Sequence, residues 1–220
     1  MSVKIKTLTW YAFLVWAVIE LAISVGNFKS SAWPALPSWL DFIFFALAAA
    51  NILLLAAEHV GRRKAWLSFF IVTVLSGAAC YFGRDFVNLS YTPLMGPMIV
   101  GSVPLALPLL WWTVVGGFYL VYRYVLPVFD ARVLALMISV SVLVFDWILE
   151  PFAWRIKFYW LWNHGTVPWQ NYFVWLLLSF VLARLVPLKG DSSPAGYQKP
   201  IIVISVMLAV FILTRLAQML

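Results

Sequence analysis

Seven apolar stretches of roughly bilayer-spanning length dominate this sequence of 220 residues. A helix that crosses a membrane needs about 20 mostly apolar residues, and aromatic residues mark many ends of these stretches, as interfacial anchors do. The stretches lie near residues 8–25, 39–57, 65–82, 103–125, 132–149, 171–186 and 200–217. They predict an all-α fold, a polytopic transmembrane helical bundle of about seven spans that forms a single integral membrane domain over residues 1–220.

Composition excludes the main alternatives to a membrane protein. Hydrophobic residues make up 65% of the chain and charged residues 10%, with a mean hydropathy of +0.97. In soluble domains roughly 45–50% of residues are hydrophobic and about 25% are charged. A soluble enzyme, a disordered chain and a disulfide scaffold are therefore excluded. Cys80 is the single cysteine and cannot form an intramolecular disulfide or a cysteine-based metal site. The first stretch is too long for a signal peptide, and we expect a retained helix.

Basic residues predict the orientation of the bundle. Ten lysines and arginines fall on the side that contains the N-terminus, and five fall on the other side. Because cytoplasmic loops are enriched in basic residues, we expect the N-terminus in the cytoplasm and the C-terminus outside. The same bias accounts for the net charge of +7, which is therefore weak evidence for nucleic-acid binding.

The two longest connections lie near residues 83–102 and 150–170, both on the predicted outer side. The first is rich in glycine and proline but apolar, and irregular backbone at membrane depth must be buried in protein or line a cavity. The second mixes aromatic residues with Arg155 and Lys157, and we expect an interfacial, partly helical segment.

Several functions of seven-helix proteins lack their residues here. The last stretch has no lysine for a retinal Schiff base, and its basic residue Arg215 lies near its end. His59 and His164 fall on opposite sides of the membrane, so they cannot ligate one haem iron or metal ion. Walker, GxSxG and HExxH motifs are absent from the sequence. We therefore predict no metal site.

Two acids at the end of the fifth stretch are the main candidates for chemistry. Asp146 and Glu150 are four residues apart, which places both carboxyl groups on one helix face. Two neighbouring carboxyl groups with little water rarely both ionise, so one is expected to keep its proton beside an ionised partner. Such a pair suits a proton donor and a water-activating base.

The sequence leaves a structural alternative open. Asp146 and Glu150 could instead pair with a nearby cation, namely Arg84, Arg155 or Lys157. Further polar candidates are Glu20, which is more simply explained by a helix-packing hydrogen bond, and Asp85, which is expected to pair locally with Arg84. Six of the thirteen tryptophans surround the two acids in the sequence. Some of these rings belong to an aromatic belt, and others could line an apolar groove and stabilise a carbocation.

A run of acids, prolines and aromatic residues extends from Asp146 to Trp175. An acid is followed four residues later by a second acid and proline, then by Tyr-Trp-x-Trp, a glycine turn and Pro-x-x-Asn-x-x-x-Trp. These positions are Asp146, Glu150 with Pro151, Tyr159 to Trp162, Gly165, Pro168, Asn171 and Trp175. A weaker upstream pattern contains Gly96, Pro97, Val103, Pro104, Pro108 and Trp111. Over residues 81–185 the sequence resembles the CruF-type carotenoid biosynthesis proteins, membrane carotenoid hydratases that include bisanhydrobacterioruberin hydratases.

One departure from the family pattern marks a divergent member. The family usually has a glutamate shortly before a Phe-Gly element; Phe82 and Gly83 are present, and Tyr91 matches a tyrosine downstream. The residues before Phe82, VTVLSGAACY, include no acid, and Glu58 is too distant to replace it. If the missing glutamate is catalytic in the family, the substrate is altered or the hydratase activity is lost.

The resemblance implies the addition of water across the terminal carbon–carbon double bond of an acyclic carotenoid, without a cofactor. It implies Asp146 and Glu150 as the catalytic acid/base pair, with Asn171 placing water or a carboxyl group. The implied substrate-binding residues are Asn171, Trp147, Tyr159, Trp160, Trp162, Trp175, Tyr91 and Trp111, with Glu20, Arg84, Asp85 and Arg155 as additional polar candidates.

The resemblance also sets the expected partners and location. We expect a carotenoid or another long isoprenoid lipid, in the bacterial or archaeal cell (inner) membrane, and no nucleic acid. Association with other carotenoid enzymes or a pigment complex stays open. The first alternative is a carotenoid- or lipid-binding membrane subunit without catalysis. A small transporter ranks below it, because only Glu20 supplies the mid-membrane polar residue that a transporter needs.

Overall fold

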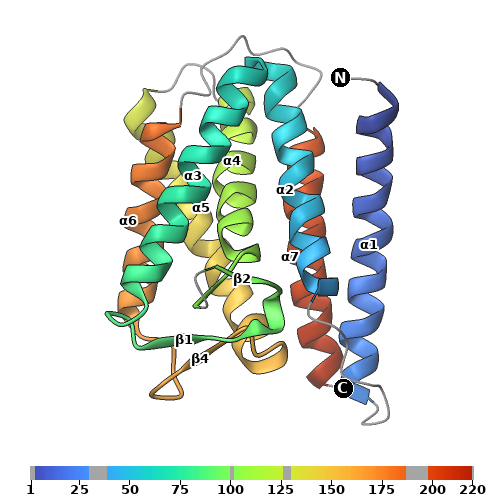
Figure 1. Cartoon of the computed structure of the whole chain (residues 1–220), viewed down its shortest axis with the longest axis vertical. Coiled ribbons are helices and arrows are strands. Elements are labelled where there is room, and N and C mark those ends of the chain that lie inside the picture. Colours follow the sequence, from blue (N-terminus) through green and yellow to red (C-terminus); the bar gives the residue numbers. More distant parts are fainter. Residues whose placement is uncertain (1–2, 30–38, 100–101, 126–129, 187–197, 220) are drawn as a thin grey trace.

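The computed structural model describes residues 3–29, 39–99, 102–125, 130–186 and 198–219. Within these residues seven α-helices stand side by side, and successive helices alternate in direction (Figure 1). They are α1 Val3–Lys29, α2 Trp39–Val60, α3 Arg62–Gly83, α4 Ala106–Val125, α5 Ala131–Glu150, α6 Trp169–Leu185 and α7 Gln198–Met219. The predicted helical bundle is confirmed.

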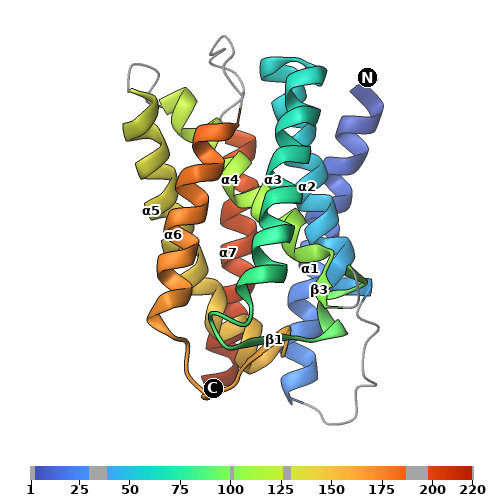
Figure 2. The ribbon, with the colours of Figure 1, turned by 60° about the vertical axis from the view of Figure 1, so that its left-hand side comes forward.

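Five of the seven helices are long and apolar enough to span a membrane: α1, α2, α3, α5 and α7. The other two are α4, with 20 residues, and α6, with 17. Both run alongside the five spans within the same bundle (Figure 2). The sequence-based boundaries of the seven stretches agree with the helices to within a few residues, except that α1 extends beyond residues 8–25 at both ends.

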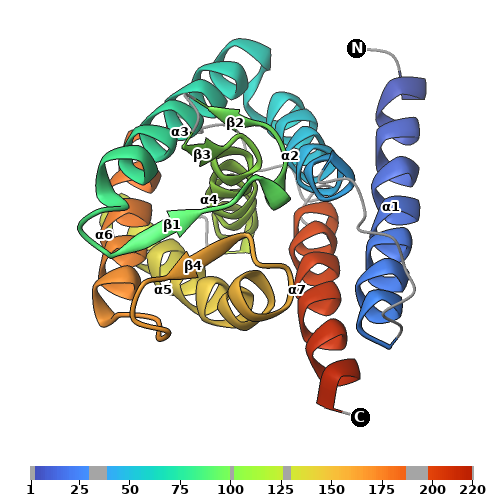
Figure 3. The same cartoon turned by 60° about the horizontal axis from the view of Figure 1, so that its bottom comes forward.

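Helix α4 lies at the centre of the bundle, as the view with the lower end turned forward shows (Figure 3). Its two glycines allow neighbouring helices to approach closely. A Cβ atom at Gly117 would lie 2.9 Å from Ile204 of α7, and one at Gly116 would lie 3.2 Å from Ile52 of α2. Small residues at helix interfaces favour this close packing in membranes. In contrast, α1 lies at the edge of the bundle, against α2 and α7 (Figure 3).

Two short antiparallel strand pairs close the lower end of the bundle (Figure 1). Strand β1, Leu89–Tyr91, pairs with β4, Trp160–Trp162, so that Leu89 faces Trp162 and Tyr91 faces Trp160. Strand β2, Met98–Ile99, pairs with β3, Val103–Pro104. The sequence predicts helices only, and the structure adds these four short strands. Strands of two or three residues carry too short a pattern to be recognised from periodicity.

The described part of the 83–102 connection is packed into the protein, as its apolar sequence predicted. Val87 and Met95 are buried, and Gly96 has a φ of 115°. A Cβ atom at Gly96 would lie 2.7 Å from Cβ of Phe42, so glycine is required where this segment crosses α2. The connection therefore forms part of the lower wall of the bundle.

The chain after α5 turns back toward the helix that it leaves. Residues Pro151–Ile156 form one wide π-helical turn, and Phe158 adopts a left-handed conformation with a φ of 53°. Backbone hydrogen bonds of 3.0 Å from Lys157 to Phe152 and of 2.8 Å from Tyr159 to Ala153 hold this reversal. Helix, turn and strand thus bring β4 beneath the end of α5. The predicted partly helical segment is confirmed, and its strand was not foreseen.

Candidate active site

Asp146 and Glu150 lie on one face of the last turns of α5, and both are buried. One side chain of α6 connects them. Nδ2 of Asn171 donates one hydrogen bond to Oδ2 of Asp146 and another to Oε1 of Glu150, each 3.0 Å long. A carboxamide has two N–H hydrogens, so both donors of Asn171 are used by the two acids. The structure thus brings together Asp146, Glu150 and Asn171, three of the residues singled out from the sequence.

The second carboxylate oxygen of Glu150 accepts hydrogen bonds from two indoles of β4. Nε1 of Trp160 lies 3.2 Å from Oε2 of Glu150, and Nε1 of Trp162 lies 3.1 Å from the same atom. Alternate residues of a strand point to the same side, so Trp160 and Trp162 face inward while Leu161 between them is exposed. Glu150 therefore has three N–H donors. By contrast, Oδ1 of Asp146 is buried without a hydrogen-bond partner.

The cations proposed as partners of these acids are engaged elsewhere. Lys157 pairs with Glu20 and Asp41, at 2.5 and 2.8 Å. The guanidinium of Arg155 lies 4.7 Å from the ring centre of Trp154. Arg84 is 3.6 Å from Asp85, the local pair that the sequence suggested. The structure thus favours a carboxyl pair held by neutral N–H donors over the alternative of a structural salt bridge.

A small pocket, with a cavity volume of about 50 Å³, borders the glutamate side of this cluster. Its lining is mostly apolar with few polar groups, which is the character of small-molecule sites. Glu150 and Asn171 reach its surface, whereas Asp146 lies behind them. The remaining lining is mainly apolar and comes from α3, α4, α6 and both paired strands: Ala79, Cys80, Gly83, Arg84, Val87, Leu89, Tyr91, Leu107, Trp111, Trp160, Trp162, Val174, Trp175 and Leu178.

Stacked tryptophans form one wall of this pocket. The rings of Trp111 in α4 and Trp175 in α6 are 4.1 Å apart between centroids, with 20° between their planes. Tyr91 contributes another aromatic ring, which packs nearly perpendicular to the ring of Trp160 with 6.5 Å between the ring centroids. Burial raises the pKa of Tyr91 well above its usual value, so its hydroxyl stays neutral at physiological pH. These rings offer flat apolar faces beside the carboxyl pair.

The structure corrects the placement of three predicted residues. Trp147 lies on the outer face of α5 with 66% of its surface exposed, because it follows Asp146 by one position, about 100° around the helix. Tyr159 is buried against Phe45 and Phe152 instead of lining the pocket. Glu20 lies with Lys157 and Asp41, so the interpretation as a simple helix-packing hydrogen bond is wrong.

Two features of the structure, one in the pocket and one outside it, are not predicted from the sequence. Cys80 of α3 lines the pocket, and Asp41 at the start of α2 pairs with Lys157. Charged residues near the end of a predicted span carry no information about which distant residue they meet. In addition, a lone cysteine in an apolar stretch is usually a packing residue.

Comparison with known proteins places the chain in a family. The family model described as "Carotenoid biosynthesis protein" matches residues 38–220. The chain belongs to the carotenoid biosynthesis protein family. This assignment and the long apolar helices make it an integral membrane protein related to carotenoid synthesis.

A curated relative gives a more specific likeness. The chain is 30% identical over 183 residues to bisanhydrobacterioruberin hydratase of Haloarcula japonica. The alignment covers 77% of this chain and 62% of that relative, so the chain spans about three fifths of the relative's length. No solved structure matches the chain. The resemblance identified from Asp146 to Trp175 is thereby confirmed at the level of the family.

Proposed function

We propose that this membrane protein hydrates the terminal carbon–carbon double bond of an acyclic carotenoid end group and forms a tertiary alcohol. The observation that carries the proposal is the Asp146–Asn171–Glu150 cluster with its two indole donors, set against an apolar, ring-lined pocket. A hydrocarbon substrate offers no polar handle, so its recognition depends on such apolar walls. The relative's name, a hydratase, supports the same chemistry.

In this mechanism Asp146 and Glu150 act as one acid/base pair that carries one proton. Glu150 is the member that lines the pocket, and it is therefore the group that contacts substrate. It protonates the less substituted carbon of the double bond, which leaves a positive charge on the tertiary carbon and a carboxylate on Glu150. Asp146 lies directly behind Glu150. Its negative charge opposes a second negative charge on Glu150, so Glu150 keeps its proton until the double bond takes it.

Water completes the reaction. A water molecule attacks the tertiary cation, and the proton that it releases returns to the Glu150 carboxylate, which regenerates the acid. Because one proton leaves and one returns, the cycle consumes only the alkene and water. The three donors from Trp160, Trp162 and Asn171 point at the oxygens where negative charge develops, which is the arrangement that lowers a barrier. The faces of Trp111 and Trp175 stabilise the cation, by about 0.5–2 kcal/mol for a well-placed ring.

The polyene beyond the end group needs a path into the bilayer. Helices α3 and α6 lie next to each other (Figure 2). Between them the pocket is lined by the small residues Ala79 and Gly83 and by Val174 and Leu178. We place the polyene in this gap, with its reactive tip at Glu150. The proposed orientation, with a cytoplasmic N-terminus, puts the pocket toward the outer leaflet.

One observation favours a second candidate, a carotenoid-binding subunit without catalysis. The wall of the pocket formed by α3 consists of Ala79, Cys80 and Gly83, with no acid in the stretch where relatives usually have one. Binding of a polyene in the same pocket without its protonation would follow if that acid were required.

Expression in a lycopene-producing bacterium, followed by pigment chromatography and mass measurement, tests the proposal. Hydration predicts new, more polar pigments that are heavier by one or two waters, because lycopene has two ends. An unchanged pigment that copurifies with the protein would reject hydration of lycopene and favour the binding subunit. Acyclic carotenoids that differ at one end group then define which end is accepted.

A further inference from the structure

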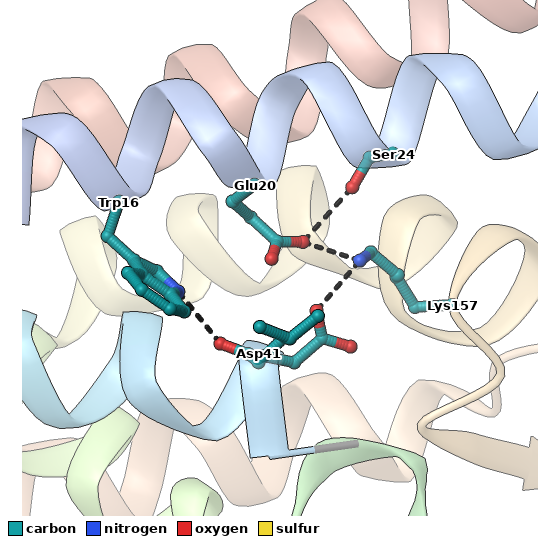
Figure 4. Close-up of polar contacts among 6 residues, drawn as sticks. Trp16, Glu20, Ser24, Asp41 and Lys157 are labelled. Atoms are coloured by element: carbon teal, nitrogen blue, oxygen red, sulfur yellow. Dashed lines mark hydrogen bonds and ion pairs between the residues drawn. The ribbon is translucent and has the colours of Figure 1, made fainter. Parts of the chain in front are cut away.

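A second buried polar cluster joins α1, α2 and the chain that follows α5 (Figure 4). Nζ of Lys157 lies 2.5 Å from Oε1 of Glu20 and 2.8 Å from Oδ1 of Asp41. The hydroxyl of Ser24 also donates to Oε1 of Glu20, at 3.0 Å. The three charged side chains are 2–14% exposed, so the pairs are shielded from solvent. This cluster lies outside the pocket lining described above.

The state of Lys157 is set by its two partners. Burial alone would lower the pKa of Lys157, but the negative charges of Glu20 and Asp41 raise it above the usual value. Lys157 is therefore an ammonium ion throughout the physiological range. A buried ion pair of this kind is costly to break, because removal of one partner leaves an uncompensated charge. The position of the Lys157 side chain is accordingly fixed between two helices.

Lys157 occupies a particular place along the chain. It lies between Glu150, which ends α5, and the two indoles that return to Glu150, Trp160 and Trp162. The same short loop therefore begins at the carboxylate, passes through the ion-paired lysine and ends at the donors to that carboxylate. Thr92 holds the following residues, with its hydroxyl 2.6 Å from the carbonyl oxygen of Phe158. The loop has an anchor on each side of its left-handed residue.

One partner of Lys157, Glu20, comes from outside the part of the chain that the family model matches. It comes from α1, which precedes the residues 38–220 that the family model matches, whereas Asp41 and Lys157 lie within them. A helix at the edge of the bundle thus contributes directly to a loop of the site.

We propose that Lys157 is a positioning residue, held by Glu20 of α1 and Asp41 of α2 so that β4 presents the indole N–H groups of Trp160 and Trp162 to Glu150. Hydrogen bonds weaken steeply when donor and acceptor lose alignment, so a small shift of the loop reduces both interactions. The consequence for catalysis rests on the function proposed above. The geometric part, an indole arrangement that depends on Glu20, does not.

The test compares two glutamates whose ion pairs tie α1 to the rest of the bundle, one at each end of α1. Glu20→Gln removes one partner of Lys157 and leaves Asp41 to neutralise it, so that the fold is retained. Glu58→Gln is the control. Glu58 of α2 pairs with Lys6 of α1, the helix that also carries Glu20, but at the other end of the bundle. Each protein is labelled with isotope-enriched tryptophan and reconstituted in lipid nanodiscs. The indole N–H resonances are assigned with Trp160→Phe and Trp162→Phe.

We expect the two indole resonances to move in the Glu20→Gln protein and to stay in place in the Glu58→Gln protein. Turnover of the Glu20→Gln protein should fall, by up to about 100-fold, with little change in KM. Lys157→Arg keeps the positive charge, so its indole resonances and turnover should stay close to those of the wild-type protein. Lys157→Met removes the charge, and it should shift both resonances and lower turnover.

Unchanged indole resonances in the Glu20→Gln protein would overturn the proposal, even if its thermal stability falls, because the cluster would then only hold α1 to the bundle. Equal effects of Glu20→Gln and Glu58→Gln would also overturn it. If the wild-type chain hydrates no carotenoid, the proposed function fails by itself, and the resonances still decide the positioning role.

Discussion

Asn171 and Glu150 are joined by a hydrogen bond of 3.0 Å between the amide Nδ2 and Oε1, which links the first turn of α6 to the last turn of α5. The second hydrogen of the same amide reaches Asp146. One side chain of a neighbouring helix therefore holds both buried acids by hydrogen bonds. Because an amide cannot itself take up the proton of the pair, it orients the acids without competing for their chemistry.

Removal of either carboxyl group should abolish conversion. We expect Glu150→Gln and Asp146→Asn to reduce hydration by at least about 100-fold, the lower end of what general acid–base catalysis contributes, without loss of expressed protein. Pigment chromatography of the expressing cells measures the effect. Glu58→Gln, far from the pocket, is the control and should keep wild-type activity. Full activity of the Asp146→Asn or Glu150→Gln protein would reject the role assigned to that acid.

Loss of the connecting amide should cost both stability and activity. Asn171→Ala leaves two acids without their common donor, and we expect a loss of about 1–3 kcal/mol in the free energy of unfolding together with a loss of turnover. Asn51→Ala is a matched control, since Asn51 is also buried and its Nδ2 also donates two hydrogen bonds, here to carbonyl oxygens of Thr9 and Leu47. Asn51→Ala should lower stability by a similar amount, as measured by thermal denaturation. It should keep the turnover per folded molecule, as measured by product yield. Equal losses of turnover in both variants would contradict a specific role for Asn171.

The two indole donors should contribute to the rate more than to binding. Trp160→Phe or Trp162→Phe removes one hydrogen bond to Oε2 of Glu150 and keeps a ring in the pocket wall. We expect kcat to fall by about 100-fold for each, by analogy with loss of one donor to a developing negative charge. Trp147→Phe, at an exposed position of α5, should leave kcat unchanged. The idea fails if Trp147→Phe and the β4 variants have the same kcat.

The proposed path of the polyene makes a prediction for neighbouring residues of α3. Ala79 lines the pocket, while Ala78 faces a separate apolar groove about 100° around the helix. Ala79→Leu should narrow the gap between α3 and α6 and weaken carotenoid binding, whereas Ala78→Leu should not. Quenching of tryptophan fluorescence by added carotenoid measures binding.

A carotenoid should also protect Cys80, which lines the same pocket, from a lipophilic maleimide. Weaker binding in both alanine variants, or no protection, would place the polyene elsewhere.

The orientation of the protein can be checked with reporters at its two ends. The charge bias of ten basic residues against five predicts fluorescence from a reporter that matures only in the cytoplasm when it is fused to the N-terminus. A phosphatase that is active only outside should work when it is fused to the C-terminus. The reverse pattern would place the pocket toward the cytoplasm and would leave its chemistry unchanged.

The helices and the two acids could be predicted from the sequence, and their partners only in part. Runs of about 20 apolar residues define spans, and the spacing of Asp146 and Glu150 places both on one helix face whatever the rest of the fold. Asn171, Trp160 and Trp162 were found through resemblance to a family pattern, because nothing in local periodicity brings α6 and β4 to the end of α5. The position of Trp147 cannot be predicted from its place beside Asp146, because neighbouring residues of a helix point about 100° apart.

Long-range pairing accounts for the remainder. Strand β1 meets β4 across about 70 residues of chain, and Lys157 meets Glu20 and Asp41 from helices at the other end of the sequence. Such contacts depend on how the helices are arranged, and the charges alone permitted several partners for Lys157. Only the folded arrangement separates the ion-paired cluster from the carboxyl pair.

The central claim is that Glu150 transfers a proton to a carotenoid double bond and water then adds to the cation. The most direct measurement incubates the purified protein in nanodiscs with lycopene in oxygen-labelled water and records the mass of the pigment. We predict an alcohol that carries the oxygen label with the wild-type protein and none with Glu150→Gln. Bound lycopene that stays unlabelled and unchanged in mass with the wild-type protein would contradict the account.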